Sequence, residues 1–127
     1  MSDLENLLRP RPEPSTLGTL AYLLLGPLAW AMQLTILYAG HTLFCSQGGA
    51  PALGDGLVVG VSAVLALLVG GFLLFPLAVA RILGLTREMD ARAAYDRIAR
   101  IAGILALVAI VWTGTTAVLV EACAQGR

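Results

Sequence analysis

The sequence predicts an all-α integral membrane protein with three transmembrane helices. Of its 127 residues, 58% are hydrophobic and only 13% are charged, and the mean hydropathy is +0.85. A soluble domain of this length has too much surface to carry such a composition. The apolar runs 17–44, 57–80 and 101–120 each reach the roughly 20 residues that a helix needs to cross a bilayer. All of the charged residues lie outside these three runs.

The N-terminal residues 1–16 form a polar segment rich in proline, with the alternating run RPRPEP at positions 9–14. Proline cannot donate a backbone hydrogen bond and favours extended geometry, so this segment predicts a tail outside the helical bundle. An arm that lies on the membrane surface or on a partner subunit is the alternative interpretation.

The first apolar run, 17–44, is longer than one straight crossing requires. At about 1.5 Å per residue it exceeds the roughly 30 Å thickness of the hydrocarbon core, so the helix must tilt or bend. Pro27 predicts a bend, because it leaves the carbonyl of Leu23 without its helical donor.

This first run also carries most of the side chains that are neither plain apolar filler nor loop. Successive helical residues turn by about 100°. One face, within roughly 100° of arc, therefore holds Trp30, Leu34, Leu37, Tyr38, His41 and Cys45, with Gln33 just off its edge. The remaining surface is apolar. We interpret the marked side as a face for helix packing or for a partner subunit, and the apolar side as facing lipid.

The segment 45–56 is rich in glycine and proline, which predicts a loop. The second span, 57–80, follows Asp55, which is a natural helix N-cap. Gly56 and Gly60 have the spacing that lets two helices approach closely, so we assign them to a packing or partner surface as well.

The segment 81–100 is predicted to be basic and outside the membrane. Its charges at four-residue intervals predict an exposed ladder on a solvated helix end, made by Glu88, Arg92, Asp96 and Arg100. The third span, 101–120, offers a packing face of small residues, namely Gly103, Thr113, Gly114, Thr115 and Thr116.

Trp30 and Trp112 lie away from the interfaces where Trp collects, so they are expected to pack between helices. A quinone or lipid site beside them is the alternative. A short tail, 121–127, ends the sequence.

The arginines predict the orientation. All of them except Arg127 lie in the tail 1–16 or in the segment 81–100, which share one side of a three-span protein. The positive-inside rule places that side, and the N-terminus, in the cytoplasm. The loop 45–56 and the tail 121–127 then lie in the periplasm of a bacterium, with the spans in its inner membrane.

The two cysteines, Cys45 and Cys123, are predicted to end the first and third spans on the same outer side. A periplasmic pair can be oxidised to a disulfide if the two Cα atoms come within roughly 7 Å. The alternative is two unrelated small apolar residues.

The spans lack the residues that catalysis or transport requires. No charged side chain lies near the middle of any span, which argues against a pump or channel. No catalytic constellation or metal motif occurs, so we predict no catalytic residue, no cofactor site and no metal site. His41 is the alternative, as a haem or metal ligand. It is the only histidine and lies one turn from the outer end, which favours an interfacial polar role.

The run Gly26-Pro27-x-x-Trp30, followed by Tyr38 and Cys45, resembles a pattern in small three-helix membrane proteins associated with bacterial haem–copper cytochrome oxidases. That pattern commonly has a histidine soon after the tryptophan, whereas this chain has Gln33 and Leu34 there. The resemblance implies an accessory subunit of a respiratory complex, with haem and copper held by the partner subunits.

The predicted function is therefore a non-catalytic accessory subunit that contacts larger membrane-complex subunits and the lipid bilayer, with bound lipid as a further expectation. We predict no nucleic-acid partner. Two alternatives remain open. One is a membrane anchor that binds haem and quinone. The other is a homo-oligomer that stands alone, such as a holin-like pore or a small exporter.

Overall fold

The computed structural model describes residues 16–46, 51–85 and 92–120, and within them it contains four helices and no strand. The helices are α2 (Thr16–Ser46), α3 (Pro51–Leu74), α4 (Pro76–Ile82) and α5 (Arg92–Leu119). Helices α2, α3 and α5 are long and apolar enough to cross a membrane. The prediction of an all-α chain with three membrane-length helices is confirmed. The predicted tails lie outside the described residues, apart from Thr16, which begins α2.

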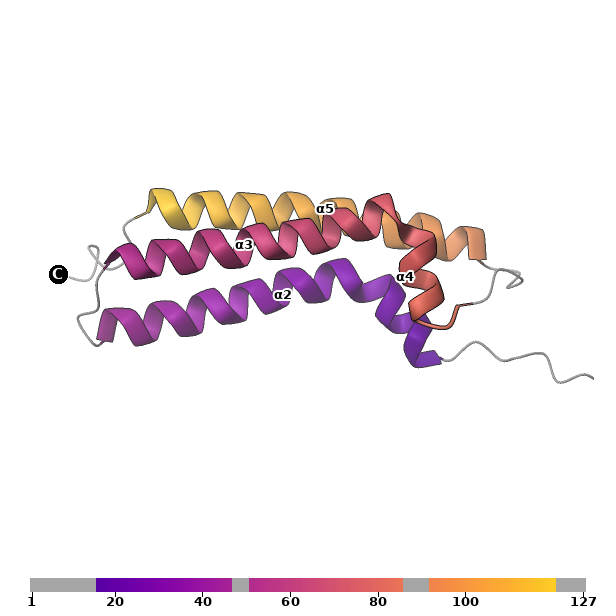
Figure 1. Cartoon of the computed structure of the whole chain (residues 1–127), viewed down its shortest axis with the longest axis horizontal. Helices are drawn as coiled ribbons and strands as arrows, with labels where there is room; N and C mark the ends of the chain where they lie inside the picture. The colour runs from indigo at the N-terminus through magenta and orange to yellow at the C-terminus, as the bar shows by residue number, and fades with distance from the viewer. Residues whose placement is uncertain (1–15, 47–50, 86–91, 121–127) are drawn as a thin grey trace, which may run out of the picture.

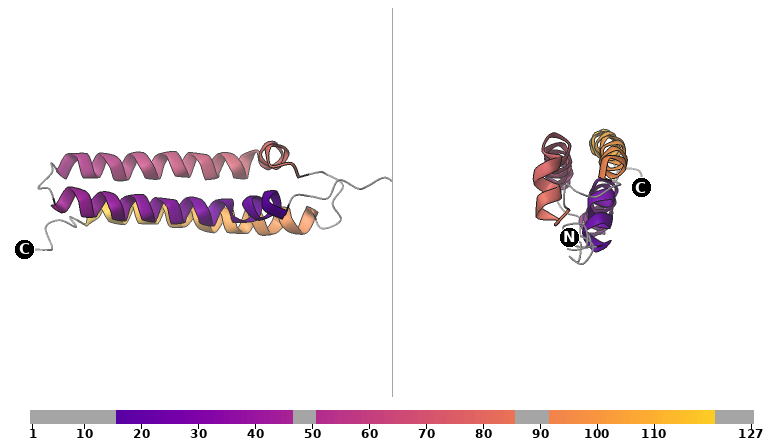
Figure 2. Two further views of the ribbon diagram at one scale, coloured as in Figure 1. Left: turned by 90° about the horizontal axis from the view of Figure 1, so that it is seen from below. Right: turned by 90° about the vertical axis from the view of Figure 1, so that its right-hand side faces the viewer.

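The three long helices lie side by side and alternate in direction (Figure 1). Seen end-on, they occupy the corners of a triangle, while α4 turns across one end of the bundle (Figure 2). This end, called here the α4 end, holds the first turns of α2 and α5 and the last turn of α3. Each long helix contacts the other two.

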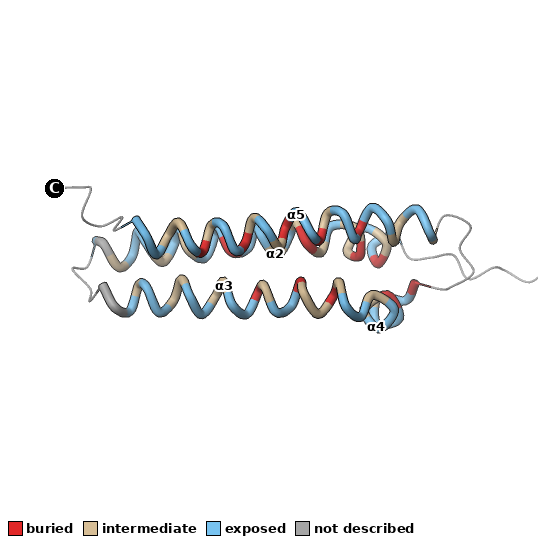
Figure 3. Tube along the Cα trace, turned by 90° about the horizontal axis from the view of Figure 1, so that it is seen from above, coloured by how far each residue is buried: buried red, intermediate tan, exposed pale blue. Residues whose placement is uncertain are grey.

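Buried residues form a thin seam between the helices, and most of the outer surface is exposed (Figure 3). Two apolar clusters make the seam. The first, at the α4 end, contains Tyr22, Phe72, Ala80, Leu85 and Ala99; the second contains Leu65, Val69 and Ile110. Large apolar side chains such as Leu67 and Leu105 point outward. Such a surface suits lipid, which removes the hydrophobic penalty that water would impose.

Glycine allows α2 and α5 to touch through their backbones. A Cβ atom on Gly26 would lie 2.9 Å from the Cα of Gly103 and 3.1 Å from the Cβ of Ala106. A Cβ atom on Gly103 would lie 2.9 Å from a methyl carbon of Leu73. Both glycines are buried, as is Gly114, so the glycines of the predicted small-residue side of the third helix do pack, whereas Thr115 of that side is exposed.

Helix α2 contains Pro27 and changes direction in its first third (Figure 1). The ring of Pro27 removes the hydrogen bond to the carbonyl of Leu23, which is the usual cause of such a bend. The predicted bend is thus present, and Pro27 directly follows Gly26, which contacts α5.

Pro76 ends the second long helix, which corrects the predicted span 57–80. Helix α3 begins at Pro51, inside the predicted loop 45–56, and stops at Leu74. Phe75 has φ −122° and ψ 54°, outside the helical region. The Cδ atom of a proline disfavours helical geometry in the residue before it, while the proline itself suits the first position of a new helix. Pro76 therefore separates α3 from α4.

Helix α4 ends in a Schellman motif, where the sequence predicted the start of a basic segment. The N–H of Leu85 donates to the carbonyl of Ala80 at 2.9 Å, and the N–H of Gly84 donates to that of Arg81 at 3.2 Å. Gly84 has φ +74°, which a residue without a Cβ adopts at little cost. Leu85 then packs into the first apolar cluster. The segment 81–100 is thus partly helical, since α5 begins at Arg92 rather than near residue 101.

Candidate functional site

The packing side of α2 is formed by its small and polar residues. Tyr22, Gly26, Ala29 and Gln33 follow one another at intervals of three or four residues, so they share one side of the helix. Tyr22 is 1% exposed and Gln33 is 0% exposed. Gly26 and Ala29 are packed against α5 and the second apolar cluster, respectively. This side of α2 meets the other two long helices.

The face predicted from the aromatic residues of the first span lies mainly on the outer surface of the chain. Gln33, which was placed at the edge of that face, is fully buried. Leu37 is partly buried, and the exposed members of the face are Trp30, Leu34, Tyr38 and His41. Packing against the chain's own helices is therefore the role of the Tyr22–Gln33 side. Contact with a partner remains the prediction for the outer face.

Gln33 joins all three long helices at the middle of the bundle. Its Nε2 donates to Ser62 Oγ on α3 at 2.8 Å and to the carbonyl of Ile110 on α5 at 3.1 Å. Gly114 makes room for this contact, because a Cβ atom there would lie 2.7 Å from Ser62 Oγ. We call these four residues the Gln33 node.

The Gln33 node joins the helices through uncharged groups only. Neither an amide nor a hydroxyl ionises in the physiological range, so the node carries hydrogen bonds across the bundle without a buried charge. Gln33 Oε1 is the one buried side-chain oxygen or nitrogen in the described part of the chain that has no hydrogen-bond partner. The node therefore retains one acceptor that is not used in joining the helices.

The two tryptophans differ in position. Trp30 Nε1 donates a long hydrogen bond of 3.4 Å to Thr113 Oγ1 of α5, so this side chain lies along a helix junction. Trp112 is 71% exposed. The expectation that Trp112 packs between helices is wrong for this chain by itself, because its side chain points to the outer surface of α5.

Gly56 and Gly60 do not bring helices of this chain together. Both are exposed, and a Cβ atom on either would meet nothing within 4 Å. Beside them, a groove of about 400 Å³ runs between α3 and α5, and its lining includes Val59, Ala63 and Val118. The close approach predicted from the glycine spacing thus remains available only to another chain or to lipid.

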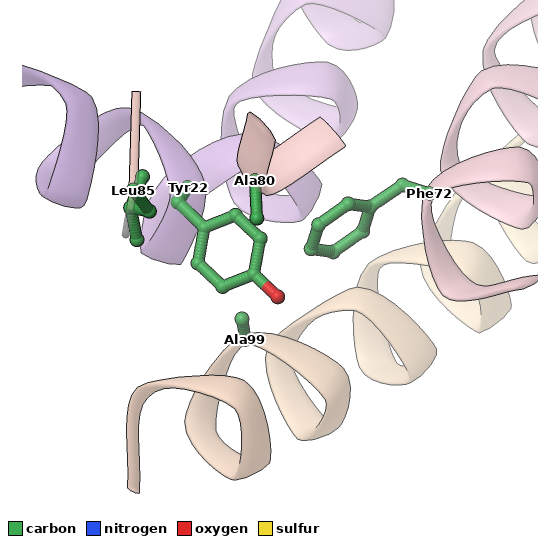
Figure 4. Close-up of a cluster of buried hydrophobic side chains, with 5 residues drawn as sticks. All are labelled: Tyr22, Phe72, Ala80, Leu85 and Ala99. Atoms are coloured by element: carbon green, nitrogen blue, oxygen red, sulfur yellow. The ribbon is translucent and has the colours of Figure 1, made fainter. Parts of the chain in front are cut away.

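A charged cluster at the α4 end ties the start of α2 to the start of α5. The hydroxyl of Tyr22 donates to Asp96 Oδ1 at 2.7 Å, and Arg92 Nε donates to the same oxygen at 3.0 Å. The guanidinium of Arg92 also lies 5.6 Å from the centre of the Tyr22 ring. Phe72 of α3 meets that ring edge-on, with the ring centres 5.3 Å apart. Figure 4 shows the Tyr22 ring between Phe72, Ala80 and Ala99. We call Tyr22, Phe72, Arg92 and Asp96 the Tyr22–Asp96 cluster.

The charge pattern predicts a solvated ladder that includes Arg92 and Asp96, and it assigns no role to Tyr22. The ladder is partly present, because Arg92 and Asp96 pair at 3.0 Å, whereas Glu88 lies outside the described residues. Tyr22 could have been found from its spacing, since it precedes Gly26 by four residues on the side that carries Gln33. A tyrosine among apolar residues needs a partner for its hydroxyl when it is buried.

The residues considered as metal ligands or as a disulfide pair are His41, Cys45 and Cys123. His41 is exposed near the end of α2 that is remote from α4. No group of three His, Cys, Asp or Glu side chains that could hold a metal occurs in residues 16–46, 51–85 and 92–120. The pairing of Cys45 with Cys123 cannot be placed, because Cys123 and the Cys45 side chain lie outside the described part.

Comparison with known proteins gives no match to this chain among protein-family models, curated proteins or solved structures.

Proposed function

We propose that this chain is a non-catalytic accessory subunit of a bacterial respiratory membrane complex, in the first place a haem–copper terminal oxidase. The observation that carries the proposal is the division of the polar and aromatic side chains. The polar side chains of the Gln33 node form hydrogen bonds that join the three helices. Tyr38 and Trp112 are exposed on the outer surface instead, where a partner can contact them.

The open surface of α3 supports a protein partner. Gly56 and Gly60 lie on α3 with free space around them, next to the groove between α3 and α5. In a membrane, small residues let a second helix approach closely enough for van der Waals contact along its length. We propose that a helix of the larger complex packs here.

The same proposal includes the orientation and location. Among the described residues, the arginines are Arg81, Arg92, Arg97 and Arg100, and the helix ends that carry them meet at the α4 end (Figure 1). The positive-inside rule then makes the α4 end cytoplasmic and the opposite end periplasmic in the inner membrane. A cytoplasm-dependent reporter fused after Arg127 is expected to be silent, and an active reporter would reverse the orientation.

A homo-oligomer is the second candidate, because the open glycines of α3 suit a second copy of the chain as well as a foreign helix. The experiment is affinity purification of the tagged full chain in mild detergent, followed by native mass determination and an optical spectrum. A large haem-containing assembly supports the accessory subunit. Recovery only as a ladder of identical chains would reject it in favour of the homo-oligomer.

Two variants sharpen this experiment. Gly60→Leu is expected to weaken recovery of the complex, whereas Gly70→Leu, also on α3 with open space around it, serves as the control. His41→Ala is expected to leave the haem content of each complex unchanged. Loss of a haem band in His41→Ala would instead favour the membrane anchor that binds haem and quinone.

A further inference from the structure

A cavity of about 420 Å³ lies beside the Tyr22–Asp96 cluster. It is bounded by the first turns of α2 and α5, by the end of α3 and by Pro76 at the start of α4. Its lining includes Tyr22, Phe72, Pro76, Asp96, Arg97 and Arg100. The cavity thus has an aromatic and apolar wall on one side and charged side chains of α5 on the other.

The charges of the lining do not cancel. Asp96 is the only carboxylate at the α4 end within the described residues, and its Oδ1 already accepts from Tyr22 and Arg92. Arg97 and Arg100 are exposed and form no ion pair with a described residue. With two arginines and one aspartate, the described lining of the cavity carries more positive than negative charge.

The apolar wall selects among anions. Phe72, Leu73 and Pro76 offer no hydrogen bond to a small hydrated ion, but they suit the glycerol and upper acyl carbons of a lipid. Guanidinium groups bind phosphate oxygens through paired N–H donors. The cavity also lies where a membrane-spanning helix meets the headgroup layer, since α5 changes there from charged to apolar residues. Basic pockets at this level between membrane helices suit lipid phosphates.

We infer that the cavity at the α4 end binds the phosphate group of an anionic membrane lipid, with Arg97 and Arg100 holding the phosphate and the Phe72–Pro76 wall holding the chain below it. Phosphatidylglycerol and cardiolipin are examples of the lipid class that we expect to bind. The inference does not rest on the proposed function, because it concerns only this chain and the bilayer around it.

The test uses the purified full chain, stripped of lipid and titrated with phosphatidylglycerol, phosphatidylcholine or inorganic phosphate, with bound lipid counted by native mass spectrometry. We expect phosphatidylglycerol to bind at least tenfold more tightly than phosphatidylcholine. The double variant Arg97→Gln/Arg100→Gln should bind roughly 30-fold more weakly, from the usual contribution of an arginine near an anionic surface. Arg81→Gln is the matched control, because Arg81 is exposed on α4 and does not line the cavity.

Asp96→Asn provides an independent variant if the double variant does not fold. It removes the negative charge that faces the cavity and keeps an oxygen for the Tyr22 hydroxyl, so phosphatidylglycerol binding should increase several-fold. Three outcomes would overturn the inference: equal binding of the two lipids, an equal loss in Arg81→Gln, or unchanged binding in Asp96→Asn. Inorganic phosphate that competes as well as the lipid would show a free-anion site and would overturn the lipid assignment.

Discussion

The Gln33 node and the Tyr22–Asp96 cluster are both polar contacts between the same helices, yet they use different chemistry. The node lies in the middle of the bundle and joins neutral groups only, at 2.8 and 3.1 Å. The cluster lies at the α4 end and contains an ion pair at 3.0 Å. A charge in the centre of a bilayer costs several kcal/mol, while one at the headgroup level is solvated. The depth of each contact therefore decides which side chains can make it.

The two regions also differ in how completely they are enclosed. Gln33 is fully buried, whereas the Asp96 side chain keeps 41% of its surface exposed. In low dielectric a hydrogen bond is electrostatically stronger, and an unpaired polar group costs more. We therefore expect the node to contribute a salt-independent stabilisation and the cluster a smaller, salt-dependent one.

The largest effect should come from a change that separates the helices between the two regions. Gly26→Leu would force a side chain against the backbone of Gly103, where even a Cβ atom would lie 2.9 Å from its Cα. We expect a loss of about 3 kcal/mol in the free energy of unfolding in detergent. Gly60→Leu, with open space around it, should change stability by less than about 0.5 kcal/mol. Equal stability of the two variants would contradict the backbone contact.

The next effect tests the node alone. Gln33→Leu removes both donated hydrogen bonds and is expected to cost about 1 kcal/mol, since hydrogen bonds between membrane helices contribute modestly. A double-mutant cycle with Ser62→Ala should give a coupling free energy above about 0.5 kcal/mol. Strict additivity of the two changes would mean that the side chains do not interact.

A smaller effect tests the cluster and its contrast with the node. Asp96→Asn removes the ion pair with Arg92 but keeps an acceptor for Tyr22, and should cost about 0.5 kcal/mol at low salt. At 1 M salt, where the Debye length is about 3 Å, this cost should largely disappear. The cost of Gln33→Leu should not change with salt. If the stability cost of both variants fell at high salt, the proposed difference between the two regions would be wrong.

The smallest effect concerns Trp30. Trp30→Phe keeps an aromatic ring but loses the 3.4 Å hydrogen bond to Thr113, which is too long to be strong. We expect a change below about 0.3 kcal/mol in unfolding free energy. A cost as large as that of Gln33→Leu would mean that the hydrogen bond of Trp30 stabilises the bundle as much as the Gln33 node does.

The presence of the three long helices followed from hydropathy, because a run of apolar residues long enough to cross lipid has few other stable conformations. The helix ends did not follow. The residues from Leu74 to Ala80 are all apolar, so hydropathy alone does not separate α3 from α4. The separation comes from Pro76 and its effect on Phe75, and the next turn comes from Gly84. These are local backbone effects that outweigh a smooth hydropathy profile.

The packing side of α2 was harder to predict than its existence. In a soluble helix the apolar side is the buried side, but a membrane helix is apolar on its lipid side too. The aromatic residues Trp30 and Tyr38 therefore led to a predicted face that lies mainly on the outer surface. Gly26 and Gln33 carried the better signal, since close backbone contact and buried hydrogen bonds occur only against protein. The pairing of Tyr22 with Asp96 spans 74 residues and could not be read from local spacing.

Helix α4 has a consequence for how deeply the protein sits in its bilayer. It lies across the bundle end (Figure 2), and Phe75 just before it and Ile82 at its end are 66% and 83% exposed. In a membrane, a short helix that lies across the bundle end would sit at the level of the lipid headgroups and would limit how far that end can move along the bilayer normal. A thicker or thinner bilayer would then be matched at the far end, by tilt of the long helices around the bend near Pro27.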